Sequence, residues 1–270
     1  MHLKNIQFSS PITVFPYFAR LQRTEGVLSV RRVRMLGQGM VLYSSTPGQI
    51  PLVGIISDIR SPYRDIPTLY RIERDGAGGG DSWKKLLAAC LVQDNTKMTP
   101  FGIIADFSIS RTDELYSQYL QEVQACANVF QSSPIPLLVQ VGVVTPPDVV
   151  RQIGQMPGVD GIVLSEYLQW NSLPKDVRSI FFGRTESPYE EKGGGLVVGK
   201  YWTPIALEWM TQTRRSGVAC PIVVGGFLKK GDVERFFTAG ATAVYIGRAV
   251  KALRPWQRYG IAREARRRNL

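Results

Sequence analysis

Polar side chains stand where several apolar runs of the sequence end, and they are of the types that work on small molecules. Such side chains, each near the end of a run, are Tyr43, Asp106, Gln140, Glu166 and Tyr167. In α/β barrels the carboxyl ends of the strands gather working groups at one face. Glu166 and Asp106 would form a carboxylate pair there, of the kind that serves as general acid and base. The structural alternative for each acid is to cap a turn or to pair with a nearby arginine.

Two residue types that carry much enzyme chemistry are scarce. The single histidine of the 270 residues is His2, which excludes histidine-based triads, proton shuttles and histidine-ligated metal sites. Cys90, Cys126 and Cys220 are far apart and form no CxxC pair, which excludes zinc and redox-disulfide sites. We interpret all three as buried thiols of a protein from a reducing compartment. No metal site is expected.

Two glycine-containing turns predict a phosphate-binding end. The apolar run 221–224 leads into Gly225 and Gly226, and the run 243–246 leads into Gly247 and Arg248. Glycine lets backbone N–H groups approach a phosphate closely, a following helix N-terminus adds donors, and an arginine adds a charged contact. In (β/α)8 barrels the loops after the last two strands form such a site. The alternative is that these glycines only make tight strand-to-helix turns.

Strand and helix signals alternate along the chain. Apolar runs rich in β-branched residues predict strands at 12–15, 40–44, 53–57, 101–107, 136–141, 161–165, 221–224 and 243–247. Their continuous apolar character is typical of parallel strands covered on both faces. Helix start signals occur at Thr145-Pro146, Thr203-Pro204 and Gly231-Asp232, and stop signals at Gly158, Gly217 and Gly240.

This alternation predicts a parallel α/β fold, (β/α)8 TIM-barrel-like, in a single domain. We expect the barrel over residues 1–253 and a basic C-terminal tail at 254–270. The segment 47–80 is rich in Pro, Gly and Asp, and we interpret it as an excursion from the barrel top. No apolar run has the roughly 18 residues of a membrane span, and the N-terminus has no apolar signal segment. A cytoplasmic protein is therefore expected.

Motifs over most of the chain resemble those of the dihydroorotate dehydrogenase family. The segments GGLVVG at 194–199, TPIAL at 203–207, PIVVGGF at 221–227 and AGATAVYIGRA at 239–249 are similar to that family's GGLSG, KPIAL, PIIGxGG and AGAxxVxxGTA. Segments at 8–12, 39–47, 67–77, 136–150 and 158–164 extend the resemblance towards the N-terminus. It is most specific from about 136 to 255.

The resemblance implies a (β/α)8 barrel that holds FMN at the carboxyl ends of its strands. The cofactor-binding residues that it implies are Gly194, Gly195, Gln140, Gly225, Gly226, Gly247 and Arg248.

The residues that carry this family's chemistry are replaced. Gln140 stands in place of the lysine of the fifth strand, Tyr43 in place of that of the second, and Glu166 near an asparagine position. The family's NxSxPN loop, with its base and substrate-binding amides, is not found. Without them dihydroorotate oxidation has neither a base nor a substrate-orienting group, so no catalytic residue is assigned. The span between Phe107 and Pro136, about 28 residues, fits one helix and predicts an irregular or missing fourth β/α unit.

Positive charge dominates the chain and points to an acidic partner. The net charge is +11, from 33 Lys plus Arg against 22 Asp plus Glu. Candidate partner-binding residues are Arg31, Arg32, Arg254, Arg258, Arg263, Arg266, Arg267 and Arg268. The tail around Trp256 and Tyr259 is expected to dock as a helix with arginines on its outer face, and a solvated basic tail is the alternative. An acidic protein assembly suits such a surface.

Three functions are compatible with these observations. We favour a catalytically degenerate barrel that acts as a structural, linker or adaptor subunit and binds an acidic protein assembly. The alternative is an FMN-dependent oxidoreductase of altered substrate specificity, which bound FMN would support. Nucleic-acid binding through the arginine-rich ends is the third, although no helix-turn-helix, RRM or zinc motif accompanies it.

Overall fold

The computed structural model describes the second half of the chain almost continuously and short parts of the first half. The described residues are 2–3, 6–7, 12–14, 30–36, 39–44, 69–73, 83–84, 102–108, 116–187, 190, 196–198, 202–226, 229, 231–246 and 255–266.

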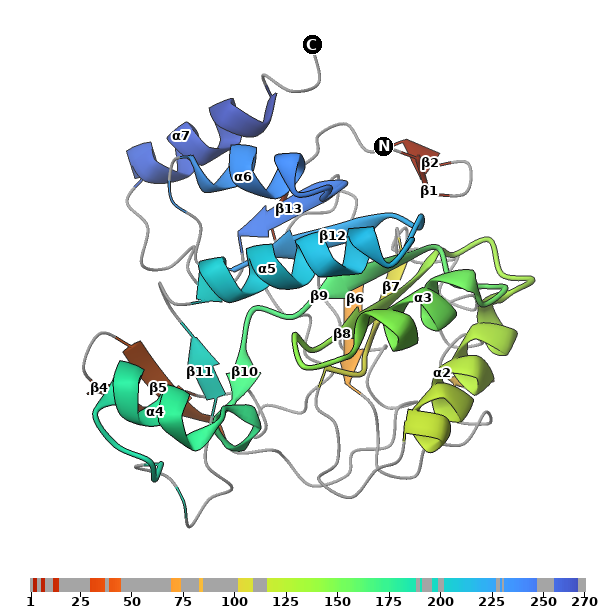
Figure 1. Ribbon diagram of the computed structural model, residues 1–270. Coiled ribbons are helices and arrows are strands. Elements are labelled where there is room, and N and C mark those ends of the chain that lie inside the picture. Colours follow the sequence, from red (N-terminus) through yellow and green to blue (C-terminus); the bar gives the residue numbers. More distant parts are fainter. Residues whose placement is uncertain are drawn as a thin grey trace.

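A parallel sheet forms the centre of the described structure (Figure 1). Its seven described strands are β3 (Ile12–Val14), β6 (Leu69–Glu73), β7 (Gly102–Asp106), β8 (Leu137–Val141), β9 (Gly161–Leu164), β12 (Ile222–Gly225) and β13 (Ala243–Ile246). Their order is β3-β13-β12-β9-β8-β7-β6, and every pair of neighbours is parallel. A mixed α/β fold with a parallel sheet is therefore confirmed.

The order of the strands in the parallel sheet follows their order in the sequence, except that the first strand lies beside the last. From β6 to β13 each parallel strand lies beside the next one in sequence, and the last, β13, lies beside the first, β3. None of the pairings among the described residues joins β3 to β6, so the described sheet does not close into a ring.

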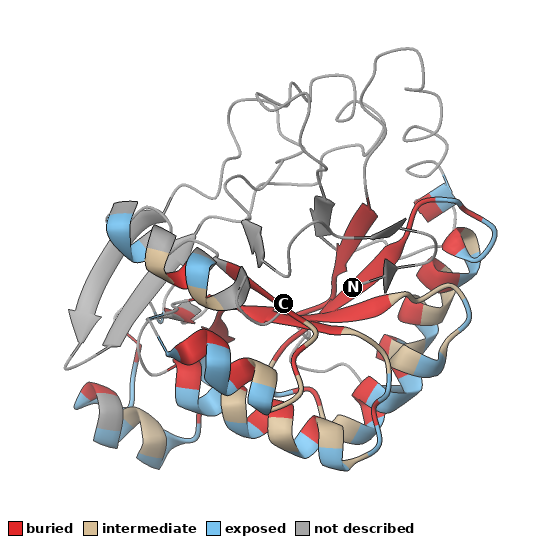
Figure 2. Ribbon diagram, turned by 90° about the horizontal axis from the view of Figure 1, so that it is seen from above, coloured by how far each residue is buried: buried red, intermediate tan, exposed pale blue. Residues whose placement is uncertain are grey.

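Helices cover one face of this sheet in a row (Figures 1 and 2). They are α2 (Tyr116–Phe130), α3 (Pro147–Gln155), α5 (Trp202–Arg215) and α6 (Asp232–Thr238), and each connects two neighbouring strands of the sheet. Contacts run from α2 to α3, α3 to α5 and α5 to α6, and α7 (Pro255–Arg266) packs on α6. Two further helical segments, the 3-10 turn η4 (Trp170–Ser172) and α4 (Lys175–Phe182), follow β9 and β10.

Both faces of the central strands are buried, as their continuous apolar runs predict. Ile103, Leu137, Ile162 and Val224 belong to the large core that the sheet shares with the helices. The alternate residues form a second cluster on the opposite face: Ile104, Leu138, Val163, Val223, Ala243 and Tyr245. Full burial of each large apolar side chain contributes about 1.5–3 kcal/mol, so the strand core is the main source of stability described here.

A smaller antiparallel sheet lies beside the parallel one and corrects one strand prediction. Its order is β10-β11-β5-β4, with bounds Leu168–Gln169, Leu196–Val198, Gly39–Ser44 and Val30–Leu36. The predicted strand 40–44 exists as β5, but it pairs antiparallel with β4 and β11 and not with a parallel neighbour. A short hairpin of β1 (His2–Leu3) and β2 (Ile6–Gln7) precedes these strands.

The first half of the chain corrects a second prediction. The segment 47–80, interpreted as an excursion, contains β6, which pairs with β7 as a full member of the parallel sheet. The predicted strand 53–57 lies outside the described residues. No described strand lies between β7 and β8, in agreement with the short span after Phe107, which holds the single described helix α2.

Helix boundaries follow the predicted signals within three residues. Gly231 caps α6 with φ 92°, a left-handed conformation that favours glycine. The cap of α3 is Pro146 and not Thr145, and α5 begins at Trp202, one residue before Thr203. Within the described part of the chain, no helix has the length and apolar character that a membrane span requires.

Candidate functional site

A buried polar network lies at the carboxyl ends of β7, β8 and β9. The Asp106 carboxylate accepts hydrogen bonds from Ser108 N (3.0 Å), Ser108 Oγ (2.5 Å) and Tyr167 Oη (3.2 Å). Ser108 Oγ also lies 2.8 Å from Tyr167 Oη and accepts from Gln140 Nε2 at 3.3 Å. All four side chains are at most 8% exposed. We call these four residues the strand-end network.

Local geometry brings the four residues together. Asp106 ends β7 and is the register partner of Gln140 on β8. Strand alternation puts both residues on the face of Ile104 and Leu138, opposite the helices. Ser108 follows Asp106 by two residues, so its N–H completes a turn on the Asp106 side chain. Tyr167 comes from the segment after β9, where the Ser165 hydroxyl holds its carbonyl at 2.9 Å.

The network joins groups that sequence reasoning named separately. Asp106, Gln140 and Tyr167 were predicted to lie at strand ends, and the structure brings them into contact through Ser108. Ser108 was missed, although an aspartate followed two residues later by serine after a buried strand is a known turn signal. Glu166, the other acid of the predicted carboxylate pair, is also buried, with 7% of its surface exposed. The described side-chain hydrogen bonds of Asp106 come from Ser108 and Tyr167.

The chemistry open to this network is limited by its internal bonds. The carboxylate accepts on both oxygens, and the hydroxyls of Ser108 and Tyr167 each have it as a partner. A general base must reach a substrate proton within hydrogen-bond distance. These side chains are nearly fully buried, and their mutual bonds connect the ends of the strands.

The predicted phosphate end is packed against the protein's own residues. The Gly226 N–H donates to the Tyr245 carbonyl at 3.2 Å, and the Trp202 indole N–H donates to the Gly225 carbonyl at 3.1 Å. A Cβ on Gly225 would collide with the backbone oxygen of Tyr245. A Cβ on Gly226, whose φ is 119°, would lie 3.0 Å from Glu166 Cβ and 3.2 Å from Trp202 Cδ1.

The described glycines of this end make contacts within the protein. A phosphate-binding glycine turn presents its N–H groups to the ligand, whereas the Gly226 N–H bonds to β13. Trp202 and Glu166 lie on the side of Gly226 where a Cβ would stand. Of the other predicted cofactor residues, Gly194, Gly195, Gly247 and Arg248 lie outside the described residues.

The predicted partner-binding arginines are described in part. Arg31 and Arg32 lie on β4, and Arg258, Arg263 and Arg266 on α7, where the Arg263 side chain is exposed. Arg254, Arg267 and Arg268 lie outside the described residues. The predicted tail helix is confirmed as α7.

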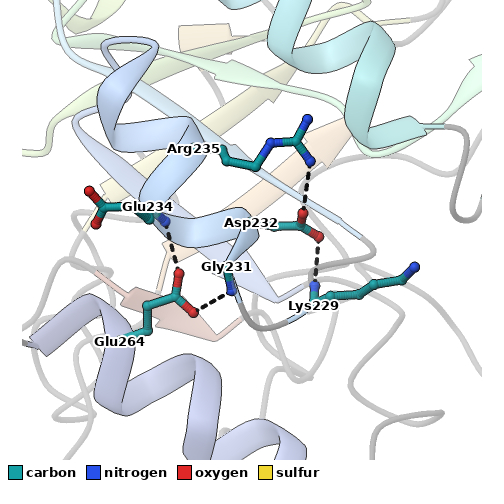
Figure 3. A network of polar contacts seen from close by, with 6 residues as sticks. All are labelled: Lys229, Gly231, Asp232, Glu234, Arg235 and Glu264. Atoms are coloured by element: carbon teal, nitrogen blue, oxygen red, sulfur yellow. Dashed lines mark hydrogen bonds and ion pairs between the residues drawn. The ribbon is translucent and has the colours of Figure 1, made fainter.

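Glu264 holds α7 against α6 (Figure 3). Its carboxylate accepts from Gly231 N at 2.8 Å and from Glu234 N at 3.0 Å, at the start of α6. These backbone N–H groups have no partner within a helix, and a carboxylate also suits the positive end of the helix dipole. Asp232 adds a local cap through Lys229 N at 2.8 Å and an ion pair with Arg235.

The described cysteines are structural. Burial raises the pKa of the Cys126 thiol far above its ordinary value, and it also raises the pKa of Cys220. The neutral thiol is a poor nucleophile, so neither residue fits a reactive role. Cys126 is buried as predicted, Cys220 is half-buried, and Cys90 lies outside the described residues.

Comparisons with known proteins give no family assignment. No protein-family model matches the chain, and no curated protein matches it.

Proposed function

We propose that this protein is a non-catalytic, dihydroorotate-dehydrogenase-like barrel that acts as a structural, linker or adaptor subunit and binds an acidic protein assembly. The observation that carries the proposal is the strand-end network. The position where a barrel enzyme keeps its working groups is occupied by four buried side chains that bond to one another.

The strand order supports the barrel part of the proposal. A first strand beside the last, with the others in sequence order, is the order of a (β/α)8 barrel. Seven parallel strands are described, and the segment that resembles the family's second strand lies in the antiparallel sheet.

The charge supports the binding part of the proposal. A net charge of +11 on 270 residues attracts acidic macromolecules. In α7 the one acidic residue, Glu264, faces α6, while Arg263 is exposed. The helix therefore presents positive charge outward.

One observation favours the alternative, an FMN-dependent oxidoreductase. Asp106, Gln140 and Tyr167 do gather at the carboxyl ends of parallel strands, the place where such enzymes work. The packing of Gly226 against Trp202 and Glu166 argues against it.

The binding part is tested by titrating the protein with poly-L-glutamate and with duplex DNA of arbitrary sequence at about 50 and 200 mM salt. We expect binding of the acidic polypeptide that weakens with salt, and weaker binding of DNA. Absence of binding to poly-L-glutamate would remove the acidic-partner proposal, and tighter binding of DNA would replace it with nucleic-acid binding.

A further inference from the structure

Two contacts fix the rotation of α7 about its own axis. Ile261 is 1% exposed and belongs to the main core. Glu264, three residues later on the neighbouring side of the helix, bonds to the start of α6. One side of α7 therefore faces the body of the protein, and the opposite side faces outward.

The outward side carries a regular stripe of positions. Helix geometry places positions 256, 259, 263 and 266, spaced by three, four and three residues, on the side opposite Ile261. Trp256 is 63% exposed, which is large for an indole ring, and Arg263 is exposed as well. We call these four positions the α7 stripe.

We propose, on the basis of the function proposed above, that the α7 stripe is the docking surface and that its occupant is an acidic amphipathic helix of the partner protein. Spacing by three and four residues is the pattern through which two helices pack side by side. An apolar side chain of the partner covers the Trp256 ring. A glutamate of the partner pairs with Arg263, whose planar guanidinium binds a carboxylate through two hydrogen bonds.

The residue types of the stripe suit this role. Trp and Arg are enriched among the interface residues that dominate binding energy. Within α7 itself, no acidic residue stands on the outward side to repel a partner glutamate, because Glu264, the only acid of this helix, bonds to α6. An extended acidic chain would gain from the charge but not from the helical spacing.

The experiment uses a synthetic helical peptide about three heptads long, with Leu and Glu at heptad spacing. Its fluorescence anisotropy is measured against the full chain, with poly-L-glutamate as the comparison. We expect the peptide to bind more tightly than poly-L-glutamate. Trp256→Ala and Arg263→Glu should each weaken it about tenfold. The control Lys175→Glu, an exposed residue of α4, carries the same charge change as Arg263→Glu and should leave peptide binding unchanged.

A charge exchange provides the second arm. A peptide in which the Glu residues are replaced by Lys should bind Arg263→Glu better than it binds the wild type. If the wild type binds the acidic peptide but both α7 variants bind it equally well, the docking surface is elsewhere and the proposed function stands. If poly-L-glutamate binds as tightly as the peptide, the helical partner is wrong. If poly-L-glutamate does not bind at all, the proposed function itself fails.

Discussion

At the scale of single residues, Asp106, Ser108 and Tyr167 depend on one another. Each hydroxyl is held by the carboxylate, and the two hydroxyls lie 2.8 Å apart. Loss of one partner leaves a buried polar atom with fewer hydrogen bonds, which costs about 1–3 kcal/mol. The three residues should therefore behave as one unit in stability measurements.

We expect Ser108→Ala and Tyr167→Phe each to lower the free energy of unfolding by about 1–3 kcal/mol. Because the two side chains are in contact, the double variant should depart from the sum of the single effects by about 0.5 kcal/mol or more. Urea unfolding measures all three values. Asn128→Ala, on the exposed side of α2, serves as control with a change within about 0.5 kcal/mol. Additive, near-zero effects would show that the network is not structural.

Gly225 and Gly260 form a matched pair of glycine positions. A Cβ on Gly225 meets the backbone of Tyr245, whereas a Cβ on Gly260 meets no atom within 4 Å. Gly225→Ala should lower the free energy of unfolding by about 1–3 kcal/mol through overpacking. Gly260→Ala, in helix α7, should raise it by about 0.5–1 kcal/mol. Thermal unfolding of both variants measures the difference.

The stability of Gly225→Ala tests why glycine is required at this turn. Strong destabilisation would mean that the strand packing alone requires glycine there. If Gly225→Ala were as stable as the wild type, the packing explanation would be wrong and a ligand requirement would regain support.

At the scale of elements, the Glu264 carboxylate bonds α7 to the start of α6. Glu264→Ala removes the acceptor for Gly231 N and Glu234 N. By analogy with the loss of an N-cap, this should cost about 0.5–2 kcal/mol. Hydrogen exchange at the amides of residues 231 and 234 should accelerate accordingly. The control Glu208→Ala, which removes an exposed contact with Gln212, should leave these exchange rates unchanged. If Glu264→Ala also leaves them unchanged, the Glu264 cap does not stabilise α6.

The elements that sequence patterns predicted well are those buried on both faces. β8, β9, β12 and β13 have continuous apolar runs because helices cover one face and the inner cluster the other. β6 (LYRIE) and β4 (VRRVRML) were missed because charged residues interrupt their apolar pattern. β5 was recognised as a strand but given the wrong neighbours, since an apolar run identifies a strand and not its pairing.

The sequence predicted the part of the candidate site that lies at the ends of parallel strands. Asp106 and Gln140 follow from two parallel runs of known length, so their proximity was foreseeable. The hydrogen bonds from Trp202 to Gly225 and from Gly226 to Tyr245 join residues about 20 positions apart in sequence. No local signal encodes them. The position of Glu264 at α6 likewise depends on how α7 packs.

At the scale of the whole molecule, a cyclic order of parallel strands is combined with a site of internally bonded side chains and a strong positive charge. Fold alone does not imply function, so the decisive observations are the contacts at the strand ends. These contacts are the basis of our proposal that the protein is not a catalyst, and the net charge is the basis of the proposed binding role.

The most direct test of this account is the visible absorption spectrum of the protein purified without added cofactor, followed by acid release of any chromophore. We expect a colourless protein that takes up no FMN when FMN is added, because the Gly226 N–H bonds to the Tyr245 carbonyl and Trp202 and Glu166 pack beside Gly226. Stoichiometric FMN in the purified protein would contradict it and establish a flavin site.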